Sequence, residues 1–203
     1  LHAAVMAAED AGTYVMVHVY VPEAIRRAIR AGVKSIEHGQ LIDEPTMKLI
    51  AEKGVWLSMQ PFIGEGNNHY TNPVQQAKHE LVVQGTDRAY QLAKKYGVKL
   101  AWGTDLLFSP ANARNQNLNI EKMTRWFSNF EILKMITHDN AELLALSGRR
   151  NPYPGKLGVI EEGALADLIV VDGNALEDIK VLTDPGKNML LIMKDGKIYK
   201  NDL

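Results

Sequence analysis

The chain has 203 residues, of which 46% are hydrophobic and 23% are charged, and its formal net charge is −1. This composition is typical of one large globular domain, or one domain with a small module; the balanced charge argues against a nucleic-acid-binding face, and no apolar run approaches the ~18–20 residues of a membrane span. The absence of cysteine excludes disulfides, cysteine-ligated zinc and thiol catalysis, and it is compatible with the cytoplasm.

Helical segments alternate with short apolar, β-branched segments along most of the chain. Pro22 begins one helical segment and Gly32 ends it, while Gly54 ends another whose first turn is acidic. Strands are predicted at 13–20, 33–39, 55–61 and 98–103. Helices are predicted at 2–11, 22–32, 43–54, 74–97 (one long helix or a broken pair), roughly 118–128 and 130–147. This alternation is typical of a parallel sheet built from βα units.

The composition changes after about Ser147, where a turn region rich in proline and glycine begins. Two apolar stretches follow, at 166–173 and 189–201. The second predicts a β-hairpin with Asp195 and Gly196 in a type I′ turn, because this dipeptide accepts positive φ at both central positions. The C-terminal part is therefore expected to be a small β module and not a continuation of the βα pattern.

Polar side chains occur at the C-terminal ends of three predicted strands. His18 lies late in the first strand, His38 ends the second, and Asp105 follows the fourth. Parallel strands open on one edge, which in an α/β barrel carries the active site, so these residues could converge in space. Two imidazoles and a carboxylate suit zinc or a related divalent metal, which lowers the pKa of bound water to about 7. Asp105 suits either role, metal ligand or general base.

Each of these residues also has a structural explanation when it is taken alone. His18 could be a hydrogen-bonded core residue, His38 could belong to a turn, and Asp105 could cap a helix or form an Asx turn. Their joint occurrence at strand C-termini favours a shared site. Tyr20 follows His18 by two residues and so shares its face of the strand. Its phenol could bind a substrate carboxylate or carbonyl, or the ring could simply pack.

Five stretches of the chain carry a resemblance to a known family. They are "VHVYVPEAIRRAIRAGVKSIEHG", "LAWGTD", "NAELLALSG", "GVIEEGALADLIVVDGN" and "IMKDGKIYKN". On these stretches the chain resembles the amidohydrolase superfamily of metal-dependent hydrolases, and within it the branch of imidazolonepropionase-like and Xaa-Pro-dipeptidase-like enzymes. The stretches cover almost the whole chain in the order of that family.

The resemblance implies an α/β fold: residues 1–154 form the C-terminal half of a (β/α)8 TIM-like barrel, with strands that resemble strands five to eight, and residues 155–203 form part of a small accessory β-sandwich. It implies that His18, His38 and Asp105 are metal ligands and that Asp105 is also the catalytic base. The family's first-strand His-x-His pair and fourth-strand lysine are absent from this sequence. We therefore expect an incomplete barrel with unpaired strand edges. Either further copies of this chain in an oligomer or a complementing N-terminal half would cover these edges.

The resemblance also implies the reaction, the metal-dependent hydrolysis of C–N bonds in amides or peptides. The implied substrate is a small molecule or a dipeptide, such as one of the Xaa-Pro type, whose carboxylate Tyr20 would bind. The implied cofactor is one or two divalent metal ions, with zinc as the expected metal. A cyclic amidase such as imidazolonepropionase is the alternative among enzymes. A non-catalytic, doubly wound α/β domain that binds a small molecule or a partner is the alternative of another class, although no strand–GxGxxG–helix phosphate loop supports it.

Overall fold

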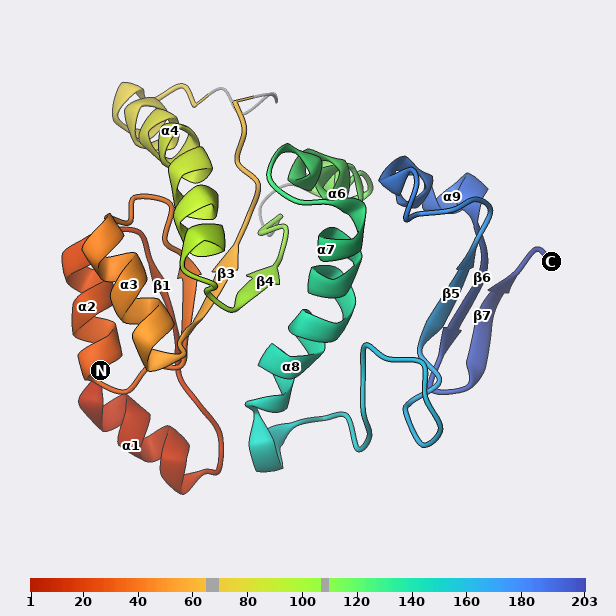
Figure 1. Cartoon of the computed structure of the whole chain (residues 1–203), viewed down its shortest axis with the longest axis horizontal. Coiled ribbons are helices and arrows are strands. Elements are labelled where there is room, and N and C mark those ends of the chain that lie inside the picture. The colour runs from red at the N-terminus through yellow and green to blue at the C-terminus, as the bar shows by residue number, and fades with distance from the viewer. Residues whose placement is uncertain (65–69, 107–109) are drawn as a thin grey trace. The chain divides into compact units, whose positions relative to one another are not determined.

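Four short strands lie side by side in chain order in the computed structural model (Figure 1), which describes residues 1–64, 70–106 and 110–203. Every neighbouring pair of these strands is parallel. Within the described residues this sheet contains β1 (Met16–Val19), β2 (Ser35–His38), β3 (Trp56–Met59) and β4 (Leu100–Trp102). The four predicted strands are thus confirmed, each over a shorter span than its apolar run.

Helices precede or connect the parallel strands at the predicted places. They are α1 (His2–Asp10), α2 (Pro22–Arg30), α3 (Glu44–Lys53) and α4 (Pro73–Lys95). The segment predicted as one helix or a broken pair is a single helix, α4, of 23 residues. In the part of the chain that the structure describes, no helix is both long and apolar enough to cross a membrane.

The order of the strands distinguishes two kinds of α/β fold. Crossovers between parallel strands are right-handed, so strands that are neighbours in consecutive order place their connecting helices on one face. Figure 1 shows α2 and α3 together on one side of the strands. A doubly wound sheet reverses its strand order at a switch point, whereas β1–β4 show no reversal among the described strands. The order of the described strands therefore differs from that of the doubly wound alternative.

The core of this sheet and its helices is apolar and closely packed. Its largest fully buried apolar side chains, each 1% exposed or less, are Ile25, Ile36, Ile42, Met47, Ile50, Leu57, Met59 and Tyr90. Full burial of one such aliphatic side chain contributes about 1.5–3 kcal/mol to the free energy of unfolding. Packing against the helices therefore fixes the positions of the strands and of their C-terminal ends.

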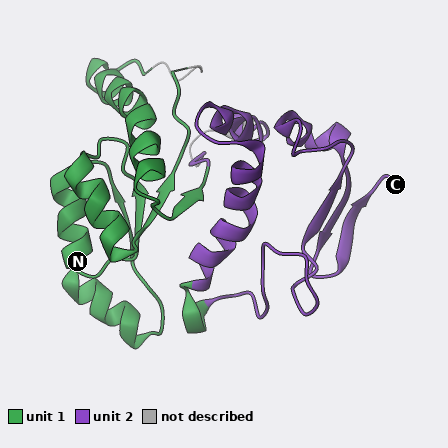
Figure 2. Ribbon diagram, viewed as in Figure 1, with its two compact units in different colours: residues 1–103, 146–150 green, residues 104–145, 151–203 purple. Residues whose placement is uncertain are grey.

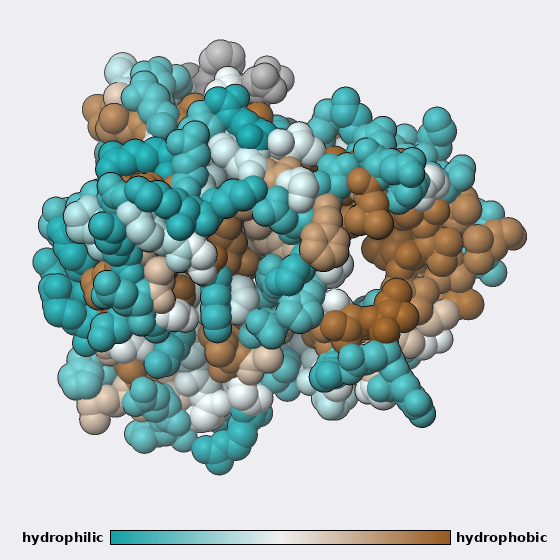
Figure 3. Space-filling view, viewed as in Figure 1, coloured by the Kyte–Doolittle hydropathy of each residue, from teal (hydrophilic) through white to brown (hydrophobic). Residues whose placement is uncertain are grey.

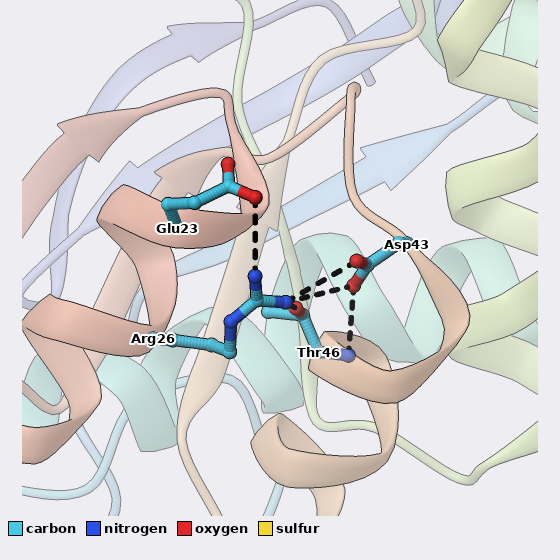
Figure 4. A network of polar contacts seen from close by, with 4 residues as sticks. All are labelled: Glu23, Arg26, Asp43 and Thr46. Atoms are coloured by element: carbon cyan, nitrogen blue, oxygen red, sulfur yellow. Dashed lines mark hydrogen bonds and ion pairs between the residues drawn. The ribbon is translucent and has the colours of Figure 1, made fainter.

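A polar network ties α2 to the start of α3 (Figure 4). Nη1 of Arg26 lies 3.2 Å from Oδ2 of Asp43 and also donates to Oγ1 of Thr46. Oδ1 of Asp43 accepts from the backbone N of Thr46 at 2.9 Å, which makes Asp43 the N-cap of α3. Burial raises the pKa of Asp43, but hydrogen bonds from the Thr46 side chain and backbone and from Arg26 outweigh it and leave this pKa below its usual value.

Two compact units divide the chain (Figure 2). Unit 1 contains residues 1–103 and 146–150, and unit 2 contains residues 104–145 and 151–203. The predicted boundary between residues 154 and 155 does not coincide with this division. The assignment of a barrel part and an accessory part on either side of that boundary stays a prediction.

Contacts between the segment after β4 and the C-terminal part explain why both belong to unit 2. Nδ2 of Asn117 donates to the backbone O of Leu182 at 2.8 Å. Nδ2 of Asn129 donates at 3.1 Å to the backbone O atoms of Leu176 and Glu177. These hydrogen bonds link segments that are about 50 residues or more apart in the chain. Local sequence patterns do not reveal contacts over such separations.

Short helices make up the first part of unit 2. They are α5 (Pro110–Ala113), α6 (Leu118–Lys122), η1 (Met123–Arg125), α7 (Asn129–Lys134), η2 (Met135–Asp139) and α8 (Asn140–Ala145). The run α7–η2–α8 is continuous and confirms the helix predicted at 130–147, with a π-helical segment at η2. Three further short helices follow: η3 (Gly148–Arg150), which belongs to unit 1, η4 (Ile179–Leu182) and α9 (Pro185–Asn188).

An antiparallel sheet ends unit 2. Among the described residues it consists of β5 (Leu168–Val171), β6 (Met189–Lys194) and β7 (Lys197–Asn201), in that order. The predicted hairpin is confirmed, because Asp195 and Gly196 join β6 to β7 with φ values of 49° and 73°. This turn needs two positive φ values, so its sequence was a reliable signal.

Part of this antiparallel sheet has an apolar surface. Ile169, Ile198 and Tyr199 are about half exposed or more, at 51%, 48% and 64%. The space-filling view shows apolar residues gathered over the C-terminal strands (Figure 3).

The Arg26–Asp43 network predicts a stability that depends on pH. A carboxyl whose pKa is lowered by folding stabilises the fold above its unfolded pKa of about 4, and this contribution is lost as the pH falls through the folded pKa. Both side chains are about one-third exposed, so screening limits the ion pair to about 0.5–1 kcal/mol. We expect Asp43→Asn, which keeps a capping side chain, to lose that amount at pH 7 and progressively less below pH 4.

Urea unfolding at several pH values measures this difference. Asp43→Ala is the matched variant, because it removes the cap as well and should lose about 1 kcal/mol more than Asp43→Asn. Equal losses for Asp43→Asn at pH 7 and below the folded pKa would contradict the role of the ionised carboxylate.

A second prediction concerns Gly85, which lies in the middle of α4. A Cβ at this position would lie 2.2 Å from the backbone O of Gln40, in the loop after β2. Helix propensity alone would make Gly85→Ala stabilising by about 1 kcal/mol. We expect the opposite sign, a loss of about 1–3 kcal/mol, because the loop backbone must move. Thermal and urea unfolding measure it; Gln84→Ala, at an exposed position of the same helix, should change stability by less than about 0.5 kcal/mol.

Candidate metal centre

His38, the last residue of β2, has an unusual backbone conformation. Its φ is 83°, in the region that favours glycine, and the residue is only 4% exposed. Among the described residues, the other non-glycine positions with positive φ are Asp105 and Asp195. The hairpin turn explains Asp195, whereas the remaining two were both predicted as metal ligands. Such a conformation costs about 1–3 kcal/mol and is concentrated at functional sites, which supports these two positions independently of the sequence pattern.

The register of β1 and β2 brings two predicted ligands into contact. Val19 pairs with His38, so the C-terminal ends of the two strands are level. Nε2 of His38 lies 2.7 Å from Nδ1 of His18, and the ring centroids are 4.3 Å apart with the planes 77° to each other. His18 is exposed and His38 is buried, so the pair runs from the surface of unit 1 into its interior.

Tyr20 completes a cluster of three rings. Its ring stacks on that of His38, with centroids 4.6 Å apart and an interplanar angle of 12°. It meets the ring of His18 edge-on, at 5.2 Å and 82°. The alternation of the strand correctly placed Tyr20 on the same side as His18. Its contact with a substrate stays a prediction.

Two buried glutamines extend the cluster, and the sequence reasoning missed both. Gln60, the residue after β3, has its Oε1 2.7 Å from Nδ1 of His38. Nε2 of Gln40 donates to the same oxygen at 3.5 Å. Gln60 is 5% exposed and Gln40 is 1% exposed. The available signal was the position of Gln60, which follows its strand in the way that Asp105 follows β4.

Asp105, the fourth predicted site residue, belongs to unit 2. It is the second residue of that unit, three positions after the end of β4, and it is exposed with φ 53°. An aspartate tolerates this left-handed conformation better than most residues, since its short side chain can bond locally. The structure thus brings together His18, His38 and Tyr20, and the association of Asp105 with them stays a prediction.

The two imidazoles fit the first half of a metal site. Zinc binds histidine nitrogen at about 2.0–2.1 Å in tetrahedral geometry, which separates two such nitrogens by about 3.4 Å. The observed 2.7 Å between Nε2 of His38 and Nδ1 of His18 is a direct hydrogen bond, which a metal could replace after a shift of less than about 1 Å. Among the described side chains, no group of three or more histidine, aspartate or glutamate residues is placed to hold a metal. Further ligands must therefore join this pair in a catalytic site, which has three protein ligands as a rule.

Comparisons with known proteins agree with the resemblance seen in the motifs. The sequence model of the amidohydrolase family matches residues 1–199. Ochratoxinase from Aspergillus niger is 33% identical over 190 residues, which are 92% of this chain and 38% of that protein. A crystal structure of a prolidase with N-methylphosphonate-L-proline is 35% identical with a TM-score of 0.86, covering 98% of this chain and 48% of that one.

A crystal structure of a Xaa-Pro dipeptidase with bound methionine is also similar. It is 32% identical with a TM-score of 0.81, and the match covers 98% of this chain and 48% of that structure. The chain therefore spans less than half the length of each of these relatives. The α/β fold of the chain is that of the matching part of these proteins.

The strained backbone of His38 predicts opposite glycine effects at the two histidines. At His38, glycine accepts φ of 83° without strain, so His38→Gly should be about 1 kcal/mol more stable than His38→Ala. At His18, an ordinary strand position, His18→Gly should be about 0.5–1 kcal/mol less stable than His18→Ala. Urea unfolding of the four variants gives both differences. The same sign at both positions would show that the conformation of His38 is not strained.

Proposed function

The chain belongs to the amidohydrolase family, and on that premise we propose that it provides part of a metal-dependent hydrolase of C–N bonds. The observation that carries this proposal is the pair formed by His18 and His38, whose ring nitrogens meet 2.7 Å apart at the ends of adjacent parallel strands. In α/β barrels the reacting groups of enzymes gather at this edge. The positive φ of His38 supports the same assignment, because strain is retained where function requires it.

In the proposed site, His18 and His38 hold a divalent metal, with zinc as the expected ion, through one ring nitrogen each. When bound there, one or two such ions would supply Lewis-acid polarisation of the scissile carbonyl and a water of lowered pKa. The carboxylate of Asp105 takes the proton of the attacking water and delivers it to the leaving nitrogen. One amide and one water thus become one carboxylic acid and one amine.

We propose dipeptides of the Xaa-Pro type as the substrate class. The two solved relatives named as prolidase and as Xaa-Pro dipeptidase support this class. The ring of Tyr20 lies against both imidazoles, so its side chain lies beside the two proposed metal ligands. It donates a hydrogen bond to the substrate carboxylate in this proposal, which selects substrates with a free C-terminus.

We also propose that a second segment completes the sheet. Within the described residues, the outer edges of β1 and β4 pair with no further strand, although parallel strands are normally paired on both sides. The chain spans less than half the length of its relatives, so a segment of similar size could supply the missing strands and ligands. The partner is a complementing N-terminal half in this proposal, and an oligomer of this chain is the other outcome of a binding test.

Zinc binding directly tests His18 and His38 as the proposed pair of metal ligands. We expect the purified, zinc-supplemented chain to bind zinc, and His18→Ala and His38→Ala each to weaken binding by at least about tenfold, because each removes a ligand. Isothermal titration and metal analysis measure the effect. His2→Ala removes an exposed histidine near the N-terminus and should leave the affinity unchanged. A supplemented chain that binds neither zinc nor manganese, alone or with the N-terminal half of the prolidase relative added, would contradict the proposed function.

Replacement of Asp105 tests the proposed base. Asparagine tolerates φ of 53° as aspartate does, so Asp105→Asn should keep the fold and lower turnover of an Xaa-Pro dipeptide by about 10²–10⁴-fold. Turnover is measured for the chain alone and with the N-terminal half of the prolidase relative added. Asp195→Asn, also at positive φ but in the C-terminal hairpin, is the matched control and should not change turnover. Unchanged turnover in Asp105→Asn would remove this residue from the mechanism.

A further inference from the structure

We propose that Gln60 is a positioning residue that fixes the tautomer of His38. Its side-chain carbonyl holds the proton of His38 on Nδ1, and this directs the lone pair of Nε2 toward the metal site. The inference rests on the proposed function for the nature of the ligand that Nε2 takes. It adds a residue from a third strand to the site.

The contact between the two side chains determines where the proton lies. Oε1 of Gln60 is 2.7 Å from Nδ1 of His38, and an amide oxygen only accepts hydrogen bonds. With the Gln60 amide in this orientation, Nδ1 carries the proton. A neutral imidazole carries one proton, so Nε2 presents its lone pair. Nε2 is also the atom that faces Nδ1 of His18 at 2.7 Å, so the lone pair points at the predicted partner ligand.

Gln40 supports the orientation of the Gln60 amide. Its Nε2 donates to the same Oε1 at 3.5 Å, and an amide oxygen has two lone pairs for two donors. Rotation of the Gln60 amide by half a turn, with Gln40 kept in place, would put its NH₂ group against the NH₂ group of Gln40. Both glutamines are at least 95% buried, so water does not compensate for two opposed donors.

The arrangement matches what a metal-binding histidine requires. Such a histidine donates its second ring N–H to an oxygen acceptor, and the loss of this acceptor weakens metal binding by about 10–100-fold. Gln60 supplies the acceptor from the end of β3, and the ring of Tyr20 stacks on the imidazole at 4.6 Å. His38 is therefore held both by a hydrogen bond and by a stacking contact before a metal arrives.

Nitrogen-15 NMR of the metal-free chain at pH 8, where a histidine of ordinary pKa is neutral, tests the tautomer. We expect His38 to carry its proton on Nδ1 in the wild type, and to lose this preference in Gln60→Met, which has similar size and no carbonyl. Gln60→Glu keeps an oxygen acceptor and should restore the Nδ1–H tautomer. Gln40→Met leaves the 2.7 Å contact in place and should retain it as well. A proton on Nε2 of His38 in the wild type, or an unchanged tautomer in Gln60→Met, would overturn the inference.

Zinc titration of the same variants tests the consequence for the ligand. We expect Gln60→Met to bind zinc about 10–100-fold more weakly than the wild type, and Gln60→Glu to bind it more tightly than Gln60→Met. Equal zinc affinity of the wild type and Gln60→Met would overturn the inference. Because the tautomer is read without metal, a wild type that binds no zinc counts against the proposed function, while the NMR result still decides the role of Gln60. Circular dichroism confirms that Gln60→Met and Gln60→Glu are folded.

Discussion

The parallel register of β1, β2 and β3 is the constraint on which the rest of the site depends. It pairs Val19 with His38 and Glu37 with Ser58, so three strands end at the same level. Residues that are about 20 positions apart in the chain then become neighbours. A shift of one residue in either pairing would turn side chains to the opposite face and separate them. The apolar core and the helices hold this register, and in that way they hold the site.

Unfavourable conformations and buried polar groups occur together at this edge of the sheet. His38 has a left-handed backbone, and Gln40 and Gln60 are among the buried polar side chains of a core that is largely apolar. Oε1 of Gln40 has no hydrogen-bond partner in the part of the chain that the structure describes, which is costly for a buried carbonyl. Folding alone gives no reason to retain these features in one place. A functional site gives such a reason, because it must hold the ring nitrogens of His38 in a fixed direction.

Unit 2 shows how a local signal and a distant one differ. The Asp195–Gly196 turn depends on two adjacent residues and was recognised from them, because Asp-Gly favours the positive φ values of a tight hairpin turn. The attachment of Asn117 and Asn129 to the segment around Leu182 depends on residues about 50 or more positions away. For this reason residues 104–145 join residues 151–203 in unit 2, a grouping that the change of composition after about Ser147 did not indicate.

The sequence by itself determined the alternation of helices and strands, the hairpin, the family and the three polar residues at strand ends, because these follow from local periodicity, turn chemistry and motifs. It indicated that His18 and His38 belong together, since both end parallel strands. Only the tertiary structure decided that the two imidazoles touch, that the backbone of His38 is strained, and that the side chain of Gln60 contacts Nδ1 of His38. A hydrogen bond across three strands depends on register, rotamer and burial at once, and no single stretch of sequence encodes all three.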